Sequence, residues 1–90
     1  MPRYTCTFDG TAPLDGRPSV PISVAVTVEA DDPDTAEARA RLAAYRRWTA
    51  DGLAARADGA MPDLALRDIS RLGWIAARTA TDGAGPYRLD

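Results

Sequence analysis

Side chains that could carry chemistry form only a few groups in this sequence. Asp31, Asp32 and Asp34 stand within four positions, and their oxygen atoms are of the kind that binds calcium or magnesium. An EF-hand loop that begins at Asp32 requires glycine at its sixth position and glutamate at its twelfth, but this chain has glutamate and alanine there. Pro33 follows, and aspartate is a favoured N-cap, so we interpret the cluster as the start of a helix.

The residue inventory removes most catalytic and metal-binding chemistries. Lysine, histidine, asparagine and glutamine do not occur, and all eleven basic residues are arginine. Without histidine no unperturbed side chain titrates near neutral pH, and one cysteine cannot supply the four ligands of a structural zinc site. Cys6 shares one strand parity with Tyr4 and Phe8, which predicts a small buried hydrophobe rather than a nucleophile. We therefore predict no enzyme activity, no cofactor and no metal.

Composition predicts one small cytoplasmic domain over residues 1–90, from a high-GC genome. Eighteen of the ninety residues are alanine, which has GC-rich codons. The apolar runs are too short to span a bilayer, and no signal-peptide core is visible. Residues 1–38 hold two arginines and seven acids, whereas residues 39–90 hold nine arginines and six acids. The basic half suggests nucleic acid or an acidic partner, or simply two solvated faces of opposite sign.

Two antiparallel strands are predicted at the start of the chain. Tyr4, Cys6 and Phe8 alternate with polar residues over positions 2–9, and five β-branched residues share one parity over positions 20–28. Residues 10–18 contain two glycines and two prolines and are predicted as a loop. Such strands form a sheet with one buried and one solvated face.

A helix is predicted over residues 33–50, with Asp32 as its N-cap. At 100° per residue, one stripe of this helix is expected to cover the sheet. The stripe consists of Ala38, Leu42, Tyr45, Thr49 and Leu53. Beyond residue 59 the segment 62–72 is ambiguous. Two leucines at a spacing of two predict a strand, whereas the wider spacing of the following apolar residues predicts a short helix. Residues 74–79 and 87–89 suggest the two strands of a hairpin.

These elements define the expected fold class as α+β. A small antiparallel sheet carries one main helix on one face, in the order β-β-α-β, with a C-terminal hairpin and a short second helix as further elements. The expected inward side chains are Tyr4, Phe8, Ile22, Val24, Val26, Val28, Leu42, Tyr45, Ile69, Leu72, Trp74 and Ile75.

A second face of the helix is a candidate protein interface. Small residues recur along it at spacings of four and three, which allows another helix to approach closely, for example in a symmetric homodimer. A tryptophan flanked by arginines is a common hot spot of protein interfaces. The alternatives are an exposed alanine stripe without a partner and a tryptophan at the edge of the core. The candidate interface residues are Ala36, Ala40, Ala43, Arg47, Trp48 and Ala50.

The stretch Leu66-x-x-Ile69-x-x-x-Gly73-Trp74-Ile75, followed by a polar turn and Tyr87-Arg88-Leu89, resembles the end of a winged-helix DNA-binding domain. The resemblance covers residues 50–90. It implies that residues 62–72 form a recognition helix and that the hairpin after it forms the wing. On that reading the candidate nucleic-acid contacts are Arg67 and Arg71 in the major groove and Arg78 on phosphate.

Residues 26–38, Val-Thr-Val-Glu-Ala-Asp-Asp-Pro-Asp-Thr-Ala-Glu-Ala, form a strand followed by a capped helix. This junction resembles small sheet-plus-helix accessory proteins of actinobacterial phages. The resemblance implies a phage or mobile-element origin and no activity. Our functional prediction is a non-enzymatic interaction protein that binds itself or a host protein. DNA binding by the basic half, residues 39–90, is the alternative.

Overall fold

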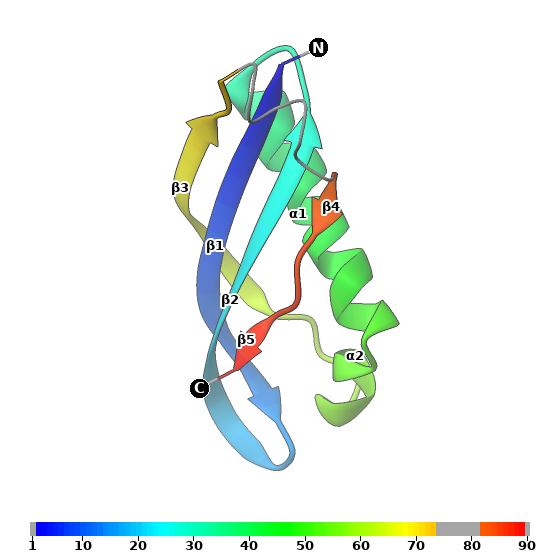
Figure 1. The fold of residues 1–90 in the computed structure, drawn as a ribbon. Coiled ribbons are helices and arrows are strands. Elements are labelled where there is room, and N and C mark those ends of the chain that lie inside the picture. The colour runs from blue at the N-terminus through cyan, green and yellow to red at the C-terminus, as the bar shows by residue number, and fades with distance from the viewer. Residues whose placement is uncertain (1, 74–81, 90) are drawn as a thin grey trace.

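A single antiparallel sheet with one long helix across it forms the body of the protein. The computed structural model describes residues 2–73 and 82–89. Its elements are β1 (Arg3–Leu14), β2 (Arg17–Glu29), α1 (Pro33–Ala50), α2 (Leu53–Arg56), β3 (Asp63–Arg71), β4 (Gly83–Ala84) and β5 (Arg88–Leu89). The strand order is β3-β1-β2-β4, and β5 also pairs with β2 (Figure 1). The predicted α+β class is confirmed.

The β1–β2 hairpin is longer than the sequence suggested. The loop predicted over residues 10–18 is wrong, because β1 continues to Leu14 and β2 begins at Arg17. Asp15 and Gly16 alone make the turn, with φ angles of 51° and 82°. Positive φ at both central residues is the backbone of a type I′ hairpin turn, for which Asp-Gly is a preferred pair. The two prolines lie on exposed positions of the strands and do not break the hairpin.

The core lies between the sheet and α1, as the alternation predicts. Cys6 and Phe8 on β1 and Val26 on β2 are fully buried, and burial raises the pKa of the Cys6 thiol. The inward positions of β2 that are buried are Val20, Ile22, Val24, Val26 and Val28. The predicted start of the helix is also confirmed, because the Asp32 carboxylate accepts a hydrogen bond from the amide of Thr35 at 2.8 Å.

The predicted stripe of α1, however, is only partly correct. Leu42 is 51% exposed, and Ala38 and Thr49 are exposed as well, whereas Tyr45 packs partly against the core and Leu53 is buried. The helix instead packs on the sheet through residues at a spacing of four, namely Ala36, Ala40, Ala44 and Trp48. Alanine brings the helix axis close to the sheet, and Trp48 fills the wider space at the end. Its indole Nε1 donates to the carbonyl oxygen of Ala60 at 3.0 Å.

The segment 62–72 is an edge strand, so the recognition helix implied by the winged-helix resemblance is not present. β3 pairs with β1 from Thr11↔Asp63 to Tyr4↔Arg71. Gly52, with φ of 77°, separates α1 from the four-residue α2. Of the predicted C-terminal hairpin, only residues 88–89 are seen as a strand, whereas residues 74–79, with Trp74, Ile75 and Arg78, lie outside the described residues. No helix in the described ranges is long and apolar enough to cross a membrane.

Candidate binding groove on the open sheet face

The face of the sheet opposite α1 is polar, and no described helix or strand covers it. Figure 1 shows both helices behind the sheet, and no described element lies on the other side. Side chains that alternate with the core point to this side, and we call them the open face. Its members on the central strands are Thr5, Thr7, Asp9, Thr11, Ser23, Ala25 and Thr27. The hydroxyl groups of Thr5 and Thr27 lie 3.2 Å apart across the two strands.

A β-bulge on β3 adds two charged side chains to the open face. Phe8 pairs with Leu66 and Thr7 pairs with Asp68, so Arg67 is an extra residue without an opposite partner. A bulge inserts one residue into the strand and redirects its side chain. Leu66 on one side of the bulge packs against the core, whereas Arg67 and Asp68 are both exposed.

The opposite edge of the sheet has an irregularity at the same level. Val26 pairs with Ala84 and Ser23 with Arg88, so four steps along the C-terminal segment match only three steps along β2. Pro86 lies within this interval and has no amide to donate, which interrupts the hydrogen-bond ladder. Thr7 is paired with Ala25 across the central hairpin, so both edge strands depart from regular pairing beside the same central pair.

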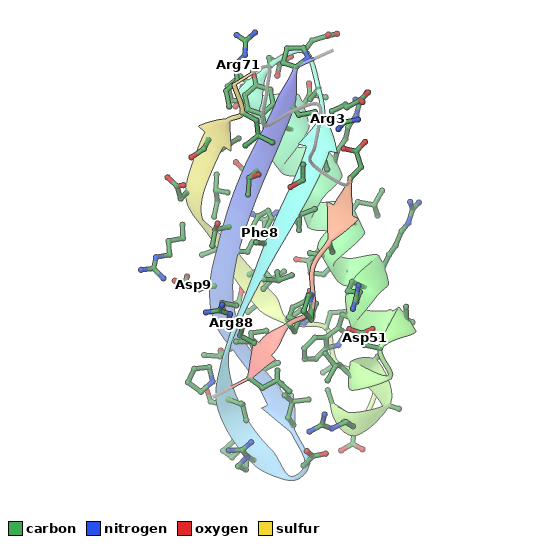
Figure 2. The ribbon with its side chains drawn as sticks, viewed as in Figure 1. Arg3, Phe8, Asp9, Asp51, Arg71 and Arg88 are labelled. Atoms are coloured by element: carbon green, nitrogen blue, oxygen red, sulfur yellow. The ribbon has the colours of Figure 1, made fainter. Side chains whose placement is uncertain are left out.

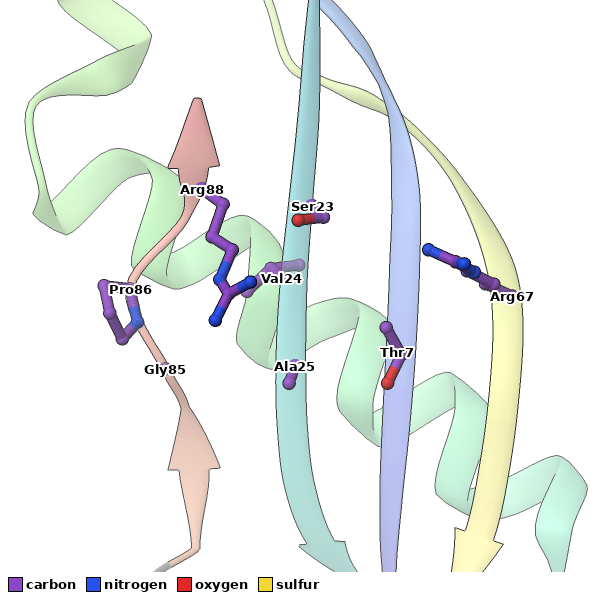
Figure 3. Close-up of a pocket in the computed structure, with 8 residues that line it drawn as sticks. All are labelled: Thr7, Ser23, Val24, Ala25, Arg67, Gly85, Pro86 and Arg88. Carbon is purple, nitrogen blue, oxygen red and sulfur yellow. The ribbon is translucent and has the colours of Figure 1, made fainter. Parts of the chain in front are cut away.

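A groove of about 380 Å³ lies between these two irregular edges. Figure 3 shows Arg67 and Arg88 on its two sides, with Thr7, Ser23 and Ala25 between them on the central strands. The hydroxyl groups of Thr7 and Ser23 make no side-chain hydrogen bond with other described residues. Val24, Gly85 and Pro86 complete the lining. The groove therefore presents two cations and two hydroxyl groups, and none of the described residues that line it is acidic.

The two arginines of the groove differ from those that the fold anchors. Five other described arginines donate hydrogen bonds to carboxylates or to carbonyl oxygens. They are Arg3, Arg39, Arg41, Arg47 and Arg56. The Arg67 side chain is 69% exposed and forms an ion pair with Asp9 at 4.0 Å, beyond hydrogen-bond distance. No hydrogen bond or ion pair holds the Arg88 guanidinium within residues 2–73 and 82–89. Neither guanidinium donates a hydrogen bond to another described residue.

Arg88 is positioned by the residue before it. The Tyr87 hydroxyl donates to the carbonyl oxygen of Ala44 at 2.7 Å, and its ring meets Trp48 edge to face at 5.1 Å. Burial raises the pKa of the Tyr87 phenol well above its ordinary value. Because neighbouring strand residues point to opposite faces, an inward Tyr87 places Arg88 outward on the open face. The pairing of Arg88 with Ser23 fixes its level at the groove.

The residues predicted as a protein interface on α1 are largely taken up by the fold itself. Ala36, Ala40 and Trp48 are fully buried against the sheet, and Ala43 is partly buried there. Arg47 donates to Asp51 and to the carbonyl oxygen of Ala84. Only Ala50 is exposed. The stripe of small residues is thus explained by the close approach of α1 to its own sheet.

Of the predicted nucleic-acid contacts, Arg67 lines the groove and Arg71 does not. Arg71 is exposed at the end of β3, and Figure 2 shows it far along the sheet from Arg88. Arg78 lies outside the described residues. Sequence reasoning missed Arg88, Thr7 and Ser23. Their outward strand parity was the only signal, and it does not distinguish a groove residue from any other exposed strand residue.

The arrangement of guanidinium and hydroxyl groups in the groove can bind an anion. Arginine stays protonated in proteins and cannot act as a general base, and its planar fork of donors suits carboxylate or phosphate. Within the described ranges no three acidic or thiol side chains are grouped so that they could hold a metal ion. In comparisons with family models, curated proteins and solved structures, the chain matches none of them significantly.

Proposed function

We propose that the chain is a non-enzymatic interaction protein that binds a partner protein on the open face of its sheet, with an acidic part of the partner facing the groove. The observation that carries this proposal is the groove between Arg67 and Arg88, whose lining within residues 2–73 and 82–89 contains two cations and no acid. Charge complementarity of this kind gives specificity and a faster rate of association. The high-GC composition supports a phage or mobile element as the source.

A protein partner fits the open face better than nucleic acid does. Single-stranded nucleic acid is bound by aromatic side chains on which bases stack, but the aromatic residues of the described chain pack in or against the core. Duplex DNA is bound by a basic surface. Asp9 and Asp68 on the same face balance the two arginines of the groove. DNA binding by the basic half remains a prediction, and Arg67 and Arg88 are the residues that support it.

Site-specific photo-crosslinking tests the proposal. The photoreactive residue p-benzoylphenylalanine is placed at Ala25 in the groove or, as a control, at Leu42 on the exposed face of α1. Each protein is irradiated in the lysate of a high-GC bacterium, and crosslinked proteins are identified by mass spectrometry. We expect a protein that is captured from position 25 and not from position 42.

The captured protein is then purified and titrated with matched variants. Ala25→Glu places an acid in the groove, and Leu42→Glu places one on the outer face of α1. We expect the first substitution to weaken binding at least tenfold and the second to leave it unchanged. Equal effects, capture from position 42 alone, or a crosslinked homodimer through position 25 would each overturn the proposal.

A further inference from the structure

The groove has the features of a carboxylate-binding site. Two guanidinium groups lie on opposite sides of it, and neither makes a hydrogen bond to a carboxylate of the fold. Arginine forms two parallel hydrogen bonds with one carboxylate, and such charge-assisted bonds are about twice as strong as neutral ones. Two arginines on opposite sides thus offer places for two carboxylates.

The floor of the groove supplies further donors at the same level. The Thr7 and Ser23 hydroxyls stand between the two arginines and have no side-chain partner among the described residues. A hydroxyl group donates one hydrogen bond, and here it can donate to a carboxylate oxygen. Ala25, opposite Thr7 and two positions along β2 from Ser23, has a small side chain that leaves room for a ligand backbone. The residues that line the groove therefore suit an extended peptide with acidic side chains.

The spacing across the sheet sets the length of that chain. β3 and β5 are separated by two central strands, so their axes lie roughly 14 Å apart at about 4.8 Å per strand. An extended peptide rises about 3.3 Å per residue, so four or five residues cross this width. In such a peptide every second side chain points to the same face, so alternate acidic residues meet the groove together.

We propose that the groove binds an extended acidic segment of the partner protein that crosses the strands, with one carboxylate on Arg67 and another on Arg88. This inference rests on the proposed function and adds the chemistry that the groove recognises. Asp9, on the same face, approaches the Arg67 guanidinium at 4.0 Å, so a ligand carboxylate on Arg67 replaces this ion pair.

A labelled hexapeptide of alternating glutamate and alanine is a direct probe of this site. Fluorescence anisotropy measures its affinity for the whole chain, with a hexapeptide of alternating glutamine and alanine as the matched control. We expect saturable binding of the glutamate peptide, at least tenfold weaker binding of the glutamine peptide, and a loss of affinity with rising salt. Equal binding of both peptides, or no saturable binding of the glutamate peptide at low salt, would overturn the inference.

Two pairs of arginine variants locate the site. Arg67→Gln with Arg88→Gln removes both groove cations, whereas Arg17→Gln with Arg46→Gln removes two exposed arginines outside the groove and lowers the net charge equally. All four side chains are exposed, so circular dichroism and the melting temperature should stay unchanged. We expect the groove pair to weaken the glutamate peptide at least tenfold and the control pair less than twofold. Equal losses would show a non-specific charge effect and refute the inference.

Two outcomes separate this inference from its alternatives. One outcome is that a six-nucleotide oligothymidylate binds more tightly than the glutamate peptide and loses its affinity in the variant with both groove arginines replaced. This result would show that the groove binds nucleic acid and not an acidic segment. If the partner captured at position 25 keeps its full affinity for the groove pair, docking on the open face stands and recognition of carboxylates falls. A parallel tenfold loss for that partner and for the glutamate peptide supports both.

Discussion

Arg67 and Arg88 lie on opposite sides of one groove, although 21 positions of the sequence and two central strands separate them. Arg67 follows the inward Leu66 and is exposed at the bulge on β3, and the inward Tyr87 sets the outward direction of Arg88. Irregular pairing at both edges of the sheet lies beside the groove.

Replacing Gly10 by alanine should destabilise the protein. A Cβ atom at Gly10 would overlap the carbonyl oxygen of Asp63, where β3 begins its pairing with β1. Because this neighbour is backbone, the strand itself must shift, and we expect a loss of about 1–3 kcal/mol in the free energy of unfolding. Urea denaturation measures it. Gly73→Ala is the control, since no atom lies within 4 Å of a Cβ at that position, and a similar loss in both variants would contradict the close approach.

The orientation of α1 can be tested with the same substitution at two positions. Ala40 is fully buried against the sheet and Ala38 is exposed. Leucine at position 40 overfills the interface and should cost about 1–3 kcal/mol of stability, whereas leucine at position 38 should change stability by less than about 0.5 kcal/mol. Thermal and urea denaturation of both variants give the comparison. The reverse order would restore the face predicted from the sequence.

Tyr87→Phe should loosen the segment that carries Arg88. The phenol loses its hydrogen bond to the Ala44 carbonyl, which is worth about 1 kcal/mol in a typical case. The loss is local, because only short strands hold this segment to β2. We expect faster amide hydrogen exchange at Leu89 and unchanged exchange at Ile69 on the other edge. Uniform acceleration at both amides would show that Tyr87 stabilises the whole fold rather than its C-terminal segment.

Stability should fall in acid through two exposed aspartates. The amide of Thr35 lowers the pKa of Asp32, and the Arg56 guanidinium lowers the pKa of Asp15. A carboxylate with a depressed folded pKa stabilises the fold above its ordinary pKa of about 3.9, and this contribution is lost as the pH falls below that value. We expect the melting temperature to drop between about pH 5 and pH 2.

The matched variants for this test replace both aspartates by asparagine. Asparagine caps a helix about as well as aspartate but does not titrate, so Asp32→Asn keeps the cap. Asp15→Asn removes the ion pair with Arg56. The double variant should be less stable than the wild type at neutral pH and should lose less stability in acid. An identical acid slope in both proteins would show that other groups control the pH dependence.

The sequence predicted the central sheet and the helix because each follows one period. Alternation identified the inward residues of β1 and β2, and the cap at Asp32 located the start of α1. The stripe failed at Leu42, Ala38 and Thr49, which are exposed, because the main contact with the sheet is made by alanines and Trp48. Small residues allow a helix to pack closely against a neighbouring element. Which face does so depends on tertiary packing and not on the sequence of the helix alone.

The groove was not predictable, because irregular pairing lies beside it. The spacing of two from Leu64 to Leu66 indicates a strand, and the spacing of three from Leu66 to Ile69 suggested a helix. The bulge at Arg67 explains both, since one extra residue lengthens the interval between inward side chains. Pairing between strands that are distant in the sequence determines where a bulge falls. For this reason no local pattern predicts that Arg67 and Arg88 line the same groove.

NMR can show most directly whether the groove between Arg67 and Arg88 binds an acidic segment. The uniformly ¹⁵N-labelled protein is titrated with the hexapeptide of alternating glutamate and alanine, and amide chemical shifts are followed. We expect saturable shifts at Thr7, Ser23, Ala25 and Gly85, which disappear when Arg67 and Arg88 are both replaced by glutamine. Shifts confined to the outer face of α1, around Leu42 and Arg46, or shifts that survive the double substitution, would contradict such binding.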